Sequence, residues 1–131
     1  MRFARNVFRF AGIWGIFNLA PLYFLFDYVG RQAPPAINHP EFYFGFAGVA
    51  LSWQFLFLLI GCDPGKYRVM MLPSMLEKVT YVLAILALFL QRRISAPIAF
   101  PAISDSVLTV LFAVSYVKTQ RIGDRYPPTP G

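Results

Sequence analysis

Few side chains in this sequence could do chemistry, and the acids Glu77 and Asp105 are the most conspicuous of them. Both lie in or beside apolar stretches of about the length of a membrane-crossing helix, and Lys78 follows Glu77 in the sequence. An ionisable group in such a stretch is typically paired, or belongs to a path for protons or substrate. Each acid also follows a proline by four residues, Pro73 and Pro101, as is typical near a helix N-terminus, where the helix dipole favours negative charge. The spacing favours this helix-end role and leaves a proton or substrate path as the alternative.

Two amides, Asn18 and Gln54, are the other polar side chains expected inside the membrane. Asn18 lies near Pro21, which has no N–H to donate to the carbonyl of Phe17, so a kink is expected there. Gln54 lies within the uncharged run 42–62, where a polar group needs a partner. We expect each amide to bond to backbone or to a neighbouring helix, and by depth they are candidates for each other. A contact with a ligand is the less favoured interpretation.

Metal and redox chemistry have little support in the residue types. His39 is the only histidine and Cys62 the only cysteine, with Asp27 and Glu41 the nearest carboxylates to the histidine. A protein metal site generally needs three or more such ligands, and an intrachain disulfide needs two cysteines. The sequence therefore predicts no metal site and no cofactor. No set of residues resembles a catalytic constellation, so no catalytic residue is assigned and a non-enzymatic role is favoured.

The amino-acid composition indicates whether water or lipid surrounds the chain. The chain has 131 residues, of which 57% are hydrophobic and 14% charged. A soluble domain of this size could not bury so much apolar surface, and the apolar residues form long blocks rather than one-sided stripes. The sequence predicts an all-α membrane protein, a bundle of four transmembrane helices at about 7–29, 41–61, 73–92 and 101–119. Residues 1–120 form this domain, and residues 121–131 form a proline-rich cytoplasmic tail.

The distribution of basic residues predicts the orientation. Nine lysines and arginines precede the first span, lie between the second and third, or follow the fourth, against three in the other two connections. This is the positive-inside pattern of a four-span protein with both termini in the cytoplasm. Because the net charge of +6 is spread over membrane-flanking segments, no nucleic-acid partner is expected.

Prolines mark the connections between spans. The prolines at 34, 35 and 40 predict a stiff loop over residues 27–40, and Asp63-Pro64-Gly65 predicts a turn. Pro97 and Pro101 are expected to separate residues 94–100 from the fourth helix.

Small residues at helical spacing predict where helices touch one another. Close contact between transmembrane helices depends on such residues, because lipid tails are as apolar as leucine. The predicted helix-contact residues are Ala11, Gly15, Gly45, Gly48, Ser52, Ala84 and Ala87. Ala47, Ala50 and Gln54 form a second face beside the one that contains Gly48. We expect partners among other membrane subunits, further copies of this chain and the lipid bilayer.

Two segments resemble a known family. FLLIGCDPGKYR, residues 57–68, and LPSMLEKVTYVLA, residues 72–84, are similar to small four-span bacterial membrane proteins of the DoxX-like superfamily, over residues 42–91. The resemblance implies a four-helix bundle in the bacterial inner membrane. Some of these relatives are associated with membrane oxidoreductase systems and others with the assembly of membrane proteins. Because this chain has one cysteine and one histidine, no redox-active residue of the family can be assigned to a position in it.

Three functions follow from these features. The first is an accessory subunit or assembly factor of a larger membrane complex. The second is a small oligomeric transporter or channel in which Asn18, Gln54 and Glu77 line a polar path. The third is a lipid- or quinone-linked enzyme that uses Glu77 or Asp105 as acid or base. It has the least support, because the two acids are expected at opposite membrane faces and so cannot work as a pair.

Overall fold

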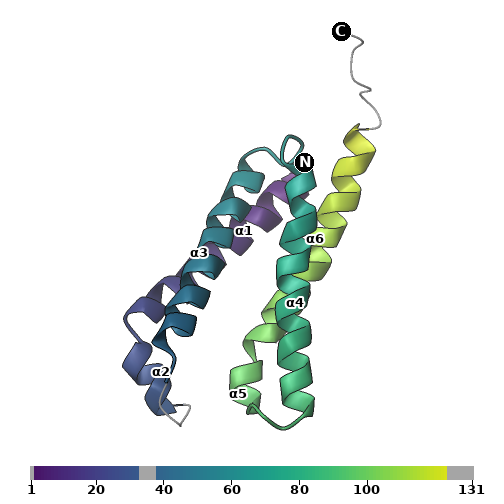
Figure 1. Cartoon of the computed structure of the whole chain (residues 1–131). Helices are drawn as coiled ribbons and strands as arrows, with labels where there is room; N and C mark the ends of the chain where they lie inside the picture. The colour runs from purple at the N-terminus through teal and green to yellow at the C-terminus, as the bar shows by residue number, and fades with distance from the viewer. Residues whose placement is uncertain (1, 33–37, 124–131) are drawn as a thin grey trace.

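The computed structural model describes residues 2–32 and 38–123, and the regular structure among them is helical (Figure 1). The helices are α1 (Arg2–Leu19), α2 (Phe26–Gln32), α3 (Pro40–Cys62), α4 (Met71–Leu90), α5 (Ala96–Ala99) and α6 (Pro101–Gly123), with 3-10 turns η1 (Ala20–Tyr23) and η2 (Arg68–Met70). The all-α prediction is confirmed for these residues. The three long helices α3, α4 and α6 start and end within a few residues of the predicted second, third and fourth spans.

Three segments are long and apolar enough to cross a membrane. They are Pro40–Cys62, Arg68–Leu90 and Ala96–Thr119. A fourth crossing exists if Arg2–Tyr23 and Phe26–Gln32, which meet at an angle of 89°, count as one span. The structure thus shows a protein with several membrane-spanning helices, three or four in number.

The predicted first span, residues 7–29, is wrong as a continuous helix. α1 ends at Leu19, the 3-10 turn η1 carries Pro21 in its first positions, and the chain then bends into α2. Pro21 cannot donate to the α-helical ladder, which accounts for the switch from α-helix to 3-10 turn, and the bend of 89° follows between Tyr23 and Phe26. The Tyr43 hydroxyl donates a hydrogen bond of 2.6 Å to the carbonyl of Leu22 and so satisfies a backbone group in this turn.

The connections differ from the predictions in two places. Residues 26–32 form α2, where the loop predicted at 27–40 was expected to contain no helix; residues 33–37 of that loop lie outside the described residues. α6 extends to Gly123, into the predicted tail, whose residues 124–131 also lie outside the description. The turn after α3 is as predicted, with the Asp63 side chain accepting a bond from the Lys66 N–H at 3.2 Å.

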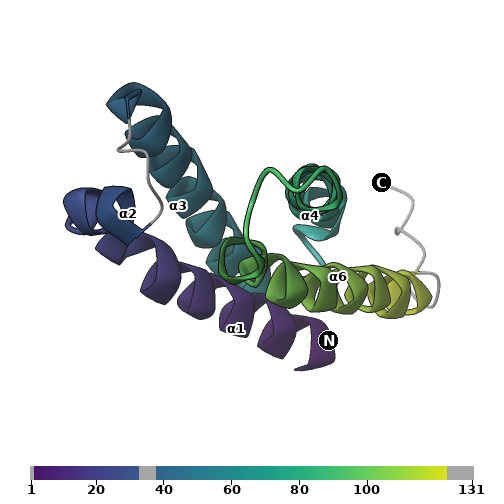
Figure 2. The ribbon, with the colours of Figure 1, turned by 90° about the horizontal axis from the view of Figure 1, so that it is seen from below.

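The long helices form two hairpins, α1 with α3 and α4 with α6, and α1 also packs against α6. Figure 1 shows the hairpins close together at the end where the chain begins and apart at the end that carries α2 and α5. Seen from below, α2 lies on the far side of the molecule from α4 (Figure 2). The fold is therefore a bundle that opens toward one end.

The core sits at the closed end. It is built from the first half of α1, the second half of α3, the start of α4 and the middle of α6. Phe8 of α1 stacks on Phe112 of α6 with ring centroids 4.2 Å apart, and Phe57 of α3 meets Phe112 edge-on at 5.0 Å. All three rings are fully buried. They join the two hairpins.

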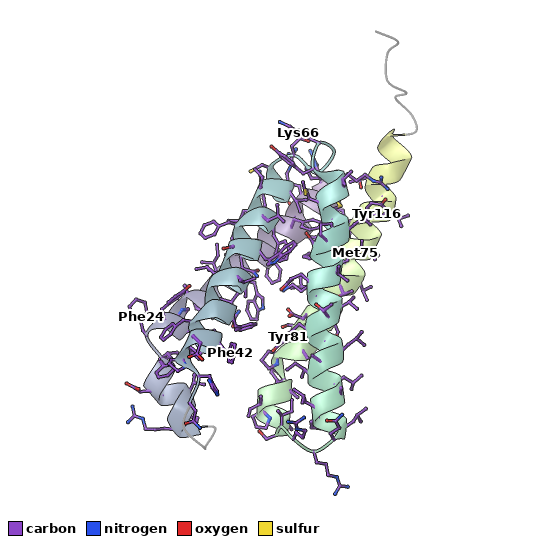
Figure 3. All side chains as sticks on the ribbon, viewed as in Figure 1. Phe24, Phe42, Lys66, Met75, Tyr81 and Tyr116 are labelled. Atoms are coloured by element: carbon purple, nitrogen blue, oxygen red, sulfur yellow. The ribbon has the colours of Figure 1, made fainter. Side chains whose placement is uncertain are left out.

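The outer surface is apolar. Large hydrophobic side chains point outward from every long helix, and Phe24 of the bend is 90% exposed (Figure 3). A water-soluble protein rarely exposes so large a continuous apolar surface. Hydrocarbon around the helices accounts for it, in agreement with the composition.

Candidate functional site

The most unusual feature of the interior is a cluster of three charged side chains between α4 and α6. The ammonium of Lys78 lies 3.0 Å from Oδ1 of Asp105, to which it donates a hydrogen bond, and 3.7 Å from Oε2 of Glu77. Lys78 is 5% exposed, while the two acid side chains are each 19% exposed. We call these three residues the ionic cluster.

Helix periodicity on α4 and α6 positions the cluster. Met71, Ser74 and Lys78 are the buried residues of α4 and share one face at spacings of three and four. That face lies against α6, where Leu108 and Ser115 are among the buried residues. Small serines allow the two helices to approach, and each serine hydroxyl bonds to a carbonyl four residues back in its own helix.

An aromatic ring covers the ammonium from the neighbouring hairpin. The Nζ atom of Lys78 lies 5.3 Å from the centre of the Phe57 ring on α3. A cation over an aromatic face is attracted to the ring quadrupole, more strongly where water is excluded. Phe57 thus links the ionic cluster to the aromatic core, so the cluster touches both hairpins.

The cluster lies near the middle of the apolar helices. η2 and α4 together run from Arg68 to Leu90, and at about 1.5 Å per residue Lys78 is about 15 Å from the first and about 18 Å from the last. Asp105 is likewise well inside the apolar segment Ala96–Thr119. A charge at this depth is expensive and is kept only when paired or functional.

Two sequence-based expectations about the acids are therefore corrected. α4 continues from η2 and begins at Met71, before Pro73, so Pro73 is not its first residue; α6 does begin at Pro101, with Asp105 one turn later. Glu77 and Asp105 also do not lie at opposite membrane faces, since both approach the same ammonium. Lys78, which was counted with the inner connection, is buried within a span; eight basic residues remain on that side against three.

Gln54 lies at a separate contact, between α3 and α1. It is 1% exposed, and its Nε2 donates to the carbonyl of Ala50 in its own helix at 2.9 Å, while its Oε1 finds no hydrogen-bond partner in residues 2–32 and 38–123. A Cβ built on Gly15 would overlap the Gln54 side chain, and one built on Gly12 would lie 2.9 Å from the Gln54 carbonyl oxygen. The glycines of α1 thus make room for the glutamine.

Asn18 does not meet Gln54. Its side chain is exposed, and its Nδ2 donates to the carbonyl of Trp14 at 2.7 Å, one turn back in the same helix. The amide therefore bonds to backbone next to the break at Pro21. Asn18, Gln54 and Glu77, the three residues predicted to line a polar path, occupy three different places in the fold.

The predicted helix-contact residues divide into two groups. Ala11 and Gly15 are buried on α1, and on α3 the buried face is that of Ala47, Ala50 and Gln54. The remaining predicted contacts are turned away from this core. Gly45, Ser52, Ala84 and Ala87 are exposed and Gly48 is half-buried.

Basic and aromatic side chains gather at the closed end of the bundle. The Arg68 guanidinium stacks on the Tyr116 ring at 3.7 Å and donates from Nε to the Tyr116 carbonyl at 3.3 Å. Lys118 lies 4.1 Å from the centre of the Phe3 ring. Cations and aromatic rings are typical of the membrane–water interface.

Metal-binding groups do not converge within residues 2–32 and 38–123, where no three His, Cys, Asp or Glu side chains come together. His39 Nδ1 and Glu41 Oε1 lie 3.0 Å apart in an exposed pair at the start of α3. Cys62, at the end of α3, is exposed.

Comparison with known proteins gives no relative: no family model, curated protein or solved structure matches the chain. The chemistry of the ionic cluster therefore rests on its own geometry. Sequence reasoning identified both acids but missed Lys78 as their shared partner. The available signal was the position of Lys78, a base next to Glu77 on the face that continues the buried residues of α4.

Proposed function

We propose that the chain crosses the membrane four times with both ends in the cytoplasm. In this proposal Arg2–Tyr23 is the first span; its 22 residues reach about 33 Å, enough for a hydrocarbon core of about 30 Å. α2 then lies along the outer interface, where Tyr28 and Arg31 fit the headgroup level. Figure 1 supports the arrangement, because the start of α1 and the end of α6 lie at the same end of the bundle.

Within the membrane, we propose that the protein is a non-catalytic accessory subunit or assembly factor that binds the helices of another membrane protein. The observation that carries this proposal is the exposure of small residues that were predicted to make helix contacts. Gly45 and Ser52 on α3 and Ala84 and Ala87 on α4 are left exposed by the folding of this chain. Small side chains on a lipid-facing helix allow a second helix to approach closely.

We extend the proposal to the family of the protein and to the membrane in which it lies. The likeness of residues 57–68 and 72–84 to the DoxX-like superfamily supports a place in the bacterial inner membrane, beside a larger complex. The features that carry the likeness are the turn and the basic pair at 63–68, with the proline and the acid at 73 and 77.

Gly45 offers a sharp test of partner binding. A Cβ at this position meets nothing within 4 Å among the described residues, so a side chain that begins there points away from the rest of the fold and toward whatever packs on α3 from outside. We expect the tagged wild-type protein, purified in mild detergent at native expression, to retain a different membrane protein in constant ratio. Gly45→Leu should lose most of it.

Val110→Leu is the matched control, because Val110 is also exposed but lies on α6. It should retain the partner. Equal recovery of the partner with the wild type, Gly45→Leu and Val110→Leu would refute the assignment of the Gly45 face of α3 as the binding surface. Recovery of a homo-oligomer alone would favour the transporter or channel described below.

The alternative is an oligomeric transporter or channel with Glu77 in a polar path. One observation favours it, the presence of three ionisable side chains halfway along apolar helices. The path in this alternative runs by the ionic cluster and not by Asn18 or Gln54. The third hypothesis, an enzyme that uses Glu77 or Asp105 as acid or base on a lipid or quinone, gains support because the two acids lie close together. Its test is whether Glu77→Gln loses a copurified lipid or quinone.

A further inference from the structure

The ionic cluster contains one base and two acids. With all three groups charged it would carry a net charge of −1 between apolar helices. Removing a charge from water into hydrocarbon is costly unless it is paired. The cluster is thus one positive charge short of neutrality.

The two acids are not equivalent. Oδ1 of Asp105 accepts a hydrogen bond from Lys78 at 3.0 Å. Oε2 of Glu77 is buried, lies 3.7 Å from the same ammonium, and has no hydrogen-bond partner among the residues that the structure describes. Asp105 takes the short charge-assisted bond of the single ammonium, and Glu77 shares that ammonium only at the longer distance of 3.7 Å.

We propose that the ionic cluster is an intramembrane binding site for one exchangeable proton, held on Oε2 of Glu77. On uptake, an O–H bond forms at Oε2 with a proton from water and the cluster becomes neutral. On release, that bond breaks, the proton returns to water, and the cluster carries −1. The bond between Lys78 and Asp105 persists in both states. The site is independent of whether the chain serves a partner protein or a transport path.

The surroundings suit such a site. The titratable groups near Glu77 are Lys78 on α4 and Asp105 on α6, and Tyr81 of α4 lies near Asp105. α3 contributes the apolar ring of Phe57, which stands over the ammonium. The acids keep 19% of their side-chain surface accessible, so the cluster lies at the border of the contact between α4 and α6 and is not sealed inside it.

Infrared spectroscopy of the full chain in lipid vesicles tests the proposal directly. Glu41 and Glu77 are the two glutamates of the sequence. Replacement of the exposed residue, Glu41→Gln, leaves Glu77 as the single glutamate, which carboxyl-¹³C glutamate then labels selectively. At neutral pH we expect one protonated carboxyl band per chain that shifts to lower frequency with the label and on exchange into D₂O.

The band should fall as pH is raised and ionised carboxylate should replace it. Glu77→Gln in the same background should abolish the band. With Glu77→Asp, the band should no longer shift with labelled glutamate, because the protonated carboxyl group then belongs to an aspartate. Absence of a protonated carboxyl band in the wild-type chain between pH 5 and pH 8, or a band that is insensitive to the glutamate label, would overturn the proposal. The labelling result uses the unaltered site, so it holds even if a Glu77 variant fails to fold.

Discussion

Lys78 on α4 and Asp105 on α6 are 27 residues apart in sequence and 3.0 Å apart in space, between Nζ and Oδ1. The pair ties the two helices of one hairpin at mid-membrane depth. Removal of either partner leaves a buried charge without compensation, which typically costs about 3–5 kcal/mol.

Lys78→Met should lower the free energy of unfolding in detergent by about 3–5 kcal/mol, because the largely buried Asp105 then loses its counter-ion. Lys66→Met is the control, since Lys66 is exposed in the turn after α3 and should change stability by less than about 0.5 kcal/mol. Thermal unfolding followed by circular dichroism measures both. The double variant Lys78→Met, Asp105→Leu should recover part of the loss; a loss as large as the sum of two single variants would contradict the pairing.

Gly15→Leu should separate α1 from α3. A Cβ at Gly15 overlaps the buried Gln54 side chain, and overpacking of this kind costs about 1–3 kcal/mol. Gly45→Ala is the matched glycine control, because the space around Gly45 is open. The same unfolding measurement applies, and Gln54→Ala should rescue Gly15→Leu. If Gly15→Leu and Gly45→Ala were equally stable, the close approach of α1 and α3 at this point would be wrong.

Arg92→Gly should stabilise the end of α4 by about 0.5–1 kcal/mol. Arg92 has φ 58°, a left-handed conformation that costs a residue with a side chain more than glycine. The Arg92 and Arg93 N–H groups donate to the carbonyls of Phe89 and Leu88, the bonding pattern of a glycine-type helix end. Arg93→Gly, without positive φ, should instead be neutral or destabilising. Thermal unfolding of the two variants gives the comparison, and the opposite order would exclude this helix end.

Labelling of single cysteines tests the four-span topology. Cys62 is exposed at the end of α3 and should react with a membrane-impermeant maleimide from the cytoplasmic side. In a Cys62→Ser chain, Ser95→Cys before α5 should react from the other side, and Arg2→Cys from the cytoplasmic side. Reaction of positions 2 and 62 from opposite sides would show that α1 does not cross the membrane.

The sequence was sufficient for α3, α4 and α6, because each contains a long uncharged run bounded by prolines, turns or charges. The break after α1 was harder to predict. A proline inside an apolar run predicts a kink, but whether the chain bends slightly or by 89° depends on tertiary contacts such as the bond from Tyr43 to Leu22.

The ionic cluster could be predicted only in part. Both acids stand out in the sequence, yet their common partner depends on the relative register of α4 and α6, which spacing along one helix does not determine. The same limit applies to α3, whose two small-residue faces are neighbours. The face of Gly48 and the face of Ala50 look equally suitable, and the position of α1 decides that the second one is buried.

The opening of the bundle toward α2 and α5 has a consequence for the bilayer itself (Figure 1). A body that widens from one side to the other occupies unequal areas in the two lipid leaflets. Lipids have more area to fill in the leaflet at the narrow end than in the leaflet at the wide end. Curvature of the surrounding bilayer relieves this difference. In the orientation proposed above the wide end lies in the outer leaflet. The protein would therefore concentrate in regions where the membrane is convex toward the outside of the cell.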